Sequence, residues 1–176
     1  MAIYRRDTGR LHELLEQRKD LLQQHFSEEE IFPAGFEISR PSPYAYVTPL
    51  IGGATLLHMA VELCDLEIAA WLLARGADVN ARSAMSEDGY GGWTPLFHAV
   101  VSLHQPRSFA QMAELLLKHG ADPTVRASIR KPVPGGDNDW YTWSAVTAVE
   151  YARRFPEADL VNQAALQLLT ELQEHS

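Results

Sequence analysis

Histidine is the residue type in this sequence with the widest chemical use, because imidazole binds metals and exchanges protons near neutral pH. The chain has seven histidines, and His98, His104 and His119 come nearest to a cluster. We expect them on a helix, in an inserted loop and beside a helix end. No C-x-x-C or H-E-x-x-H motif, the spacings typical of zinc sites, accompanies them. The pattern favours surface or capping histidines, with no metal and no cofactor.

The single cysteine, Cys64, is the candidate nucleophile. Glu62 and Asp65 are close to it in sequence, and nearby carboxylates raise the pKa of a thiol and suppress its reactivity. We interpret Cys64 as a partly buried turn residue. One cysteine also excludes an intramolecular disulfide, which favours a reducing compartment.

Two further patterns have catalytic or phosphate-binding counterparts. The glycine-rich run at 89–92 is followed by no G-K-[ST] and predicts a hairpin turn, not a phosphate loop. The carboxylate pairs Glu87-Asp88 and Asp137/Asp139 lie in expected loops, with nothing to hold them in a dry cleft. The sequence therefore predicts a protein that is not an enzyme.

Composition and charge narrow the class of partner. Of the 176 residues, 46% are apolar and 22% charged, as in globular domains, and the formal net charge is −8. An acidic surface repels phosphate backbones, so we expect a protein partner, a basic one, and no nucleic acid. Solubility alone explains the charge equally well. The polar N-terminus resembles no signal peptide, and no apolar run is long enough for a membrane span, so we expect a cytoplasmic protein.

Two segments repeat one sequence pattern. TLLHMA at 55–60 leads to LLARGADVN at 72–80, and TPLFHA at 94–99 leads to LLKHGADPT at 116–124; a weaker copy, TAVEYA, begins at 147. These segments resemble ankyrin repeats, whose signature is T-P-L-H-x-A, a helix pair and a G-A-D-x-N-like turn. The resemblance implies an all-α solenoid of helix pairs with β-hairpin loops.

The repeated motif also has a physical interpretation. Thr55 and Thr94 stand where helix N-caps belong, and Pro95 suits the first helical position. Gly76 and Gly120 suit a left-handed helix end. Helix pairs are expected at about 54–75, 94–119 and 147–173, with Leu72 and Leu116 in the apolar seam between repeats. The resemblance implies a structural role for His58.

Departures from the repeat define the organisation of the chain. Gly76 and Gly120 are 44 positions apart, against about 33 in a regular repeat. The excess lies in a long hairpin at 82–92 and a loop at 103–108. We expect one domain, with an N-terminal cap helix and irregular connection at 1–52, a repeat at 53–92, a repeat with a long insertion at 93–146 and a C-terminal capping repeat at 147–176.

The insertion at 125–144 is rich in arginine and aromatic residues. Trp140, Tyr141 and Trp143 are costly to leave in water unless they pack on something. Two interpretations stay open: the aromatics fold back on the third repeat, or they form a binding surface, with Trp140 and Trp143 serving different sides. We expect an ordered flap whose removal leaves stability nearly unchanged.

The resemblance implies a non-catalytic module that binds another protein through its concave face and hairpin loops. We expect the chain to be a monomer. The alternatives are a neutralising or regulatory subunit for a basic toxin or enzyme, and an enzyme using the 125–144 loop. The predicted contact residues are Met59, Glu62, Met85, Glu87, Tyr90, His98, Val101, Arg126, Arg130, Trp140, Tyr141 and Arg153.

Overall fold

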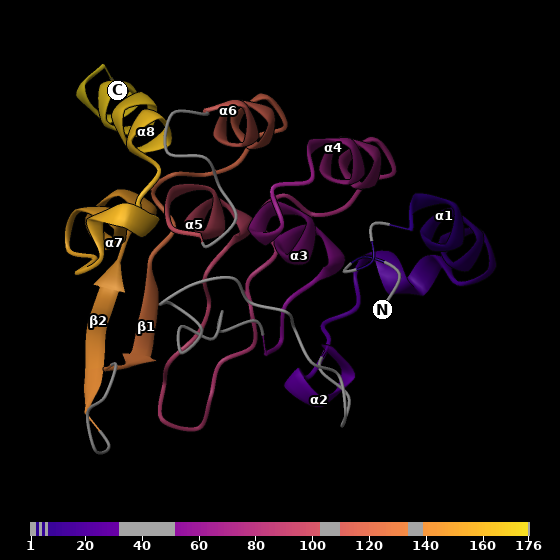
Figure 1. Cartoon of the computed structure of the whole chain (residues 1–176), viewed down its shortest axis with the longest axis horizontal. Helices are drawn as coiled ribbons and strands as arrows, with labels where there is room; N and C mark the ends of the chain where they lie inside the picture. The colour runs from indigo at the N-terminus through magenta and orange to yellow at the C-terminus, as the bar shows by residue number, and fades with distance from the viewer. Residues whose placement is uncertain are drawn as a thin grey trace.

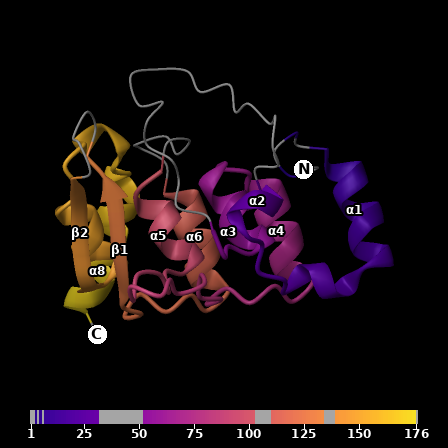
Figure 2. The same cartoon turned by 90° about the horizontal axis from the view of Figure 1, so that it is seen from below.

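The computed structural model describes residues 3, 5, 7–31, 52–102, 110–133 and 139–175. Helix pairs stand side by side along the molecule, with the N-terminal helix at one end and the only described sheet at the other (Figures 1 and 2). The elements in chain order are α1 (Thr8–Gln17), η1 (Lys19–Leu22), α2 (Glu28–Ile31), α3 (Leu56–Glu62), α4 (Leu66–Ala74), α5 (Pro95–Val100), α6 (Gln111–Lys118), β1 (Ala127–Pro132), β2 (Trp140–Val146), α7 (Ala148–Arg153), η2 (Ala158–Leu160) and α8 (Gln163–Glu174).

The three expected helix pairs are present as α3–α4, α5–α6 and α7–α8. Thr55, Thr94 and Thr147 are the N-caps of α3, α5 and α7, and Pro95 opens α5. Leu72 and Leu116 have no exposed surface, which confirms the predicted seam. The 103–108 loop and most of the expected irregular connection before the first repeat lie outside the described residues.

His58 has the structural role that the resemblance implies. The backbone N–H and the hydroxyl of Thr55 donate to its Nδ1 at 3.2 and 2.9 Å, and Nε2 lies 3.1 Å from the Trp93 carbonyl oxygen. These partners leave the ring neutral, with its proton on Nε2. Burial lowers the pKa of His58 to about 3. The ring therefore ties the start of α3 to the chain that enters α5.

Side-chain amides join successive repeats at their turns. Asn80 donates from Nδ2 to the Gly120 carbonyl at 2.9 Å and accepts from the Asp122 N–H at 2.8 Å. Gln23, just after η1, makes the same pair of bonds one repeat earlier, to the Gly76 carbonyl at 2.7 Å and the Asp78 N–H at 3.3 Å. The N-terminal segment thus caps the stack with the contact that the repeats themselves use.

The turns need unusual backbone angles at a few positions. Gly76 and Gly120 each have φ of 88°, as expected for left-handed helix ends. Cys64, between α3 and α4, has φ of 53°, where a residue with a side chain is strained by about 1–3 kcal/mol. Cys64 is half-buried, in agreement with the predicted turn residue.

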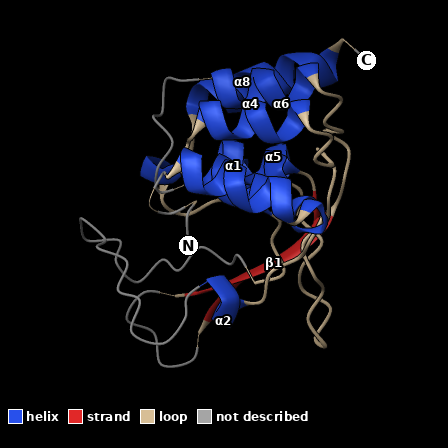
Figure 3. Cartoon of the chain, turned by 90° about the vertical axis from the view of Figure 1, so that its right-hand side faces the viewer, coloured by secondary structure: helices blue, strands red, loops and turns tan. Residues whose placement is uncertain are grey.

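The fold is a solenoid of helix pairs, as predicted, and it also contains a small two-stranded sheet, so the all-α part of the prediction is not fully confirmed. β1 and β2 form an antiparallel pair in which Ile129 faces Trp143 and Lys131 faces Tyr141. The pair lies below the helices, next to α7 (Figures 1 and 3). β-Branched and aromatic residues at Ile129, Thr142 and Trp143 favour strand, and they give the expected ordered flap its two strands.

Candidate protein-binding surface

The two long insertions of the chain lie against each other. Residues 82–92 close into a hairpin through Ser83 N–H to the Trp93 carbonyl at 2.8 Å and Ser86 N–H to the Tyr90 carbonyl at 2.7 Å. Gly91 and Ser128 then exchange backbone hydrogen bonds of 2.6 and 3.2 Å. Both segments project below the helices (Figure 1). We call residues 82–92, 127–133 and 139–146 the paired hairpins.

Gly91 is required at this junction. Its φ is 135°, and a Cβ at this position would lie 2.2 Å from the Ala84 carbonyl oxygen. Any side chain would therefore force the two edges of the 82–92 hairpin apart.

Arg130 on β1 fixes the two hairpins to each other. Its Nη1 lies 2.8 Å from Asp88 Oδ2, and its guanidinium lies 4.9 Å from the centre of the Tyr90 ring and 5.1 Å from that of Trp140. A cation over an aromatic face stabilises by about 0.5–2 kcal/mol. One side chain thus connects both strands of the sheet to the neighbouring hairpin.

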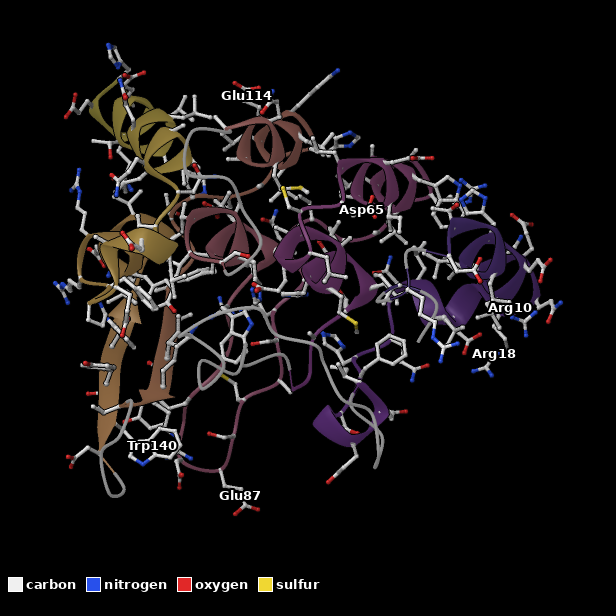
Figure 4. All side chains as sticks on the ribbon, in the orientation of Figure 1. Arg10, Arg18, Asp65, Glu87, Glu114 and Trp140 are labelled. Carbon is white, nitrogen blue, oxygen red and sulfur yellow. The ribbon has the colours of Figure 1, made fainter. Side chains whose placement is uncertain are left out.

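The outer part of the paired hairpins combines apolar and acidic side chains. Met85 is 58% exposed and Trp140 is 49% exposed. Glu87, Asp88 and Asp139 are exposed around them. Figure 4 shows Trp140 and Glu87 at the ends of the hairpins, away from the helices. Large apolar side chains surrounded by charge are typical of protein-binding sites.

Trp143 faces the core and Trp140 faces solvent, in agreement with the interpretation that the two tryptophans serve different sides. Trp143 is 5% exposed and packs on Phe155 and Tyr151, at ring-centre distances of 5.8 and 5.1 Å. Ile129 is also buried, at 3%. Because Ile129 lies in the core, we now expect that replacing residues 127–142 lowers stability, contrary to the expectation from the sequence.

Two titratable groups with shifted pKa values lie near each other's elements, Lys131 on β1 and Tyr151 on α7. Burial lowers the pKa of the Lys131 amine and raises that of the Tyr151 phenol, while the neighbouring Glu62 and Glu157 raise both. The Lys131 Nζ lies 5.2 Å from the centre of the Phe155 ring. Tyr151 and Phe155 are themselves core residues, so we interpret this group as packing.

Four predicted contact residues are buried, which corrects the expected open concave face. Met59, Glu62, His98 and Val101 are 3–8% exposed. His98 Nδ1 and Glu62 Oε2 are 2.8 Å apart, joining α5 to α3, and Val101 pairs with Val161 before α8. These side chains connect elements of the repeats, which is why they are covered.

The remaining predicted residues divide into exposed and structural ones. Tyr90, Arg130 and Tyr141 are half-buried, and Arg126 and Arg153 are exposed. Arg126 binds the Glu150 carboxylate at 2.9 Å and the Ala145 carbonyl, and this ion pair lowers the pKa of Glu150. Arg153 donates to Thr170 Oγ1 at 3.2 Å. Both arginines hold α7 to its neighbours.

The Arg130 junction is the feature that sequence reasoning missed. Arg130, Tyr90 and Trp140 were each predicted as contact residues, but nothing in the sequence pairs them across 40 or 50 positions. Within the described ranges, no three His, Cys, Asp or Glu side chains gather closely enough to hold a metal ion. None of the described helices has the length and apolar character needed to cross a bilayer.

The comparisons with known proteins agree with this architecture. Residues 51–127 match the family model for ankyrin repeats (3 copies). The chain is 42% identical over 71 residues to human 2-5A-dependent ribonuclease, covering 40% of this chain and 8% of that protein. It is 34% identical over 84 residues to mouse Rabankyrin-5, covering 43% and 7%. The Arabidopsis thaliana ADP-ribosylation factor GTPase-activating protein AGD4 is 36% identical over 73 residues, covering 42% and 8%.

Repeated helix pairs, left-handed glycine turns and the family match together define a helical repeat protein. Residues 51–127 of the chain are ankyrin repeats. The chain spans less than a tenth of the length of each of the three relatives. Ankyrin repeats are generally protein–protein interaction modules, and repeat stacks offer extended surfaces for that purpose.

Proposed function

We propose that this chain is a non-catalytic protein-binding module that contacts a basic protein through its paired hairpins. The observation that carries the proposal is the Arg130 junction, which holds Trp140 half-exposed on a sheet anchored in the core. A tryptophan that is held at the surface by a contact with Arg130 is a candidate binding residue.

The residue types of the surface support this role. Binding energy at protein interfaces concentrates in Trp, Tyr and Arg, and the paired hairpins carry Trp140, Tyr90 and Arg130 together. Ordering a side chain on binding costs about 0.5–1.5 kcal/mol. Arg130 already orders Trp140 and Tyr90 in the folded chain. Much of this entropic cost is therefore incurred when the chain folds, and less of it opposes association.

Charge supports a basic partner. The chain carries a net charge of −8, and Glu87 and Asp139 lie exposed beside the apolar residues. Exposed charges at the edge of an interface mainly accelerate association, and salt screens them. We therefore expect an association rate that falls as ionic strength rises.

The test uses the full chain as bait in an extract of its native host, with captured proteins identified by mass spectrometry. A Met85→Ser/Trp140→Ala variant should lose a protein that wild type retains. The matched control is Leu172→Ser, which replaces a large apolar residue, 41% exposed, on α8. Capture by the hairpin variant at wild-type level, or loss only in the control, would contradict the proposal.

A further inference from the structure

A pocket lies between the N-terminal cap and the first helix pair. Its volume is about 330 Å³, near the lower end of the range for sites that bind small molecules. α1 and α4 stand next to each other at the end of the molecule away from β1 and β2 (Figures 1 and 2). The pocket is therefore separate from the paired hairpins. The residues that line it come from α1, from η1 and from the end of α4: Leu15, Glu16, Lys19, Leu22 and Arg75.

Two leucines give the pocket an apolar side. Leu15, on α1, is 5% exposed, and Leu22, at the end of η1, is half-buried against the core. The charged residues of the pocket are more exposed, with side-chain exposures of 68% for Glu16 and 41% for Arg75. A ligand in this pocket would therefore place an apolar part on the leucines and a polar part toward solvent.

Arg75 is held beside the pocket by a stack of side chains. Its guanidinium carbon lies 3.8 Å from the centre of the Trp71 ring, and the His12 ring stacks on the same indole at 4.0 Å. A guanidinium that lies on an aromatic face keeps its N–H donors at its edge. The Glu16 carboxylate, 3.8 Å from Nη2, is too distant to accept a hydrogen bond from it. Arg75 therefore has donors available for an anionic ligand.

Lys19 brings a second positive charge to the pocket. Within the described ranges its ammonium makes no ion pair, whereas Nη2 of the neighbouring Arg18 lies 2.6 Å from Asp20 Oδ2. Lys19 follows the end of α1 and Arg75 is the C-cap of α4, and helix C-termini favour positive charge, so two cations can share one pocket. Two cations and the Glu16 carboxylate leave a formal charge of +1 on a chain of net charge −8. This local excess of positive charge favours an anion.

We propose that this pocket binds a small carboxylic acid with an aliphatic body, in its ionised form. The single charge of a carboxylate balances the charge of the pocket, whereas a phosphate dianion would exceed it beside the Glu16 carboxylate. Arg75 and Lys19 donate to the carboxylate oxygens, which the planar guanidinium matches in geometry. The aliphatic body lies on Leu15 and Leu22, where its burial drives binding. The site does not depend on the proposed protein partner.

The test titrates octanoate into the purified full chain, by calorimetry and by nuclear magnetic resonance of the tryptophan indole N–H groups. Octanoate should bind with a dissociation constant of about 1 mM or lower, and octanamide, a neutral analogue of nearly the same shape, about tenfold more weakly. The Trp71 indole signal, identified with a Trp71→Phe variant, should shift because Arg75 lies on that ring. No binding of octanoate, equal binding of octanamide, or a shift confined to other tryptophans would overturn the proposal.

Charge variants, each checked for folding by a thermal melt, locate the anion. Lys19→Gln and Arg75→Gln should each weaken octanoate binding by about threefold or more, because each removes a charged donor. Glu16→Gln should strengthen it, since it removes a repelling carboxylate. Arg18→Gln is the matched control: it removes the same charge beside Lys19, but from a side chain bound to Asp20, and should bind octanoate as wild type does. Unchanged binding in both Lys19→Gln and Arg75→Gln, or an equal loss in Arg18→Gln, would contradict the proposed site.

Discussion

The helical body and the paired hairpins of this protein are held together in different ways. In the body, each repeat supplies its own N-cap threonine and helix pair, the first two repeats end in glycine turns, and the first is fixed by the short-range contact of His58 with Thr55. In the paired hairpins, one residue, Arg130, joins segments that are distant in sequence. The helical body is therefore held by contacts between residues close in sequence, which recur from repeat to repeat. The surface of the paired hairpins depends instead on single contacts between residues far apart in sequence.

The largest expected effect separates the two sides of the insertion. Trp143→Ala should lower the free energy of unfolding by about 3–5 kcal/mol, because it removes a buried ring packed on Phe155 and Tyr151. Trp140→Ala, at the exposed end of the same strand, should cost less than about 1.5 kcal/mol. Urea unfolding of both variants measures the difference. Equal losses would remove the distinction between an inner core face and an outer contact face.

The seam of the helical body should be nearly as sensitive. Leu72→Ala and Leu116→Ala should each cost about 2–5 kcal/mol, because both side chains are fully buried between helices. Thermal melts monitored by circular dichroism report the loss. If both variants melted within a degree of wild type, stacking of the repeats would not be what stabilises the body.

The buried imidazole of His58 makes the body sensitive to acid. Its pKa is about 3 in the folded chain, against about 6.5 when unfolded, so between these values only the unfolded state binds the proton. Stability from this group is complete above pH 6.5 and falls by about 1.4 kcal/mol for each pH unit below it, toward pH 3. Urea unfolding across this range should show the slope in wild type. A His58→Gln variant with the same slope would contradict the assignment.

The smallest stability effect is expected at Arg130. Arg130→Gln should cost about 1 kcal/mol or less, because the ion pair with Asp88 and the ring contacts are partly exposed. The Trp140 ring should nevertheless lose order, which increases its quenching by acrylamide. Tryptophan quenching unchanged from wild type would show that Arg130 does not position Trp140; a Trp140→Phe background provides the baseline from the other tryptophans.

The helices and turns of the body were predicted well from the sequence, because the residues that specify each of them lie close together in the chain. The caps at Thr55 and Thr94, the turns at Gly76 and Gly120 and the apolar seam each follow from residues within one repeat. Cys64 was placed in its turn for the same reason. The role of Gln23 was not predicted, because it follows no recognisable repeat motif. Its side-chain amide nevertheless binds the next turn in the same way as that of Asn80.

The exposure of the candidate contact residues was predicted only in part, because it depends on tertiary packing. Met85, Glu87 and Trp140 were correctly expected to be exposed, since loops with no helical neighbour remain in water. Glu62 and His98 were expected to be accessible, and their mutual contact buries them. Hairpin loops were predicted, but the bounds of β1 and β2 were not, because Lys131 interrupts the apolar series of Ala127 and Ile129.

The central claim is that the paired hairpins bind the partner while the helical body supports them. The most direct measurement is the dissociation constant of the captured partner, by titration calorimetry, for wild type, Met85→Ser/Trp140→Ala and Leu172→Ser, with a thermal melt of each. We predict that the hairpin variant binds at least about tenfold more weakly while melting close to wild type, and that the control binds normally. Wild-type affinity in a folded hairpin variant would contradict the claim.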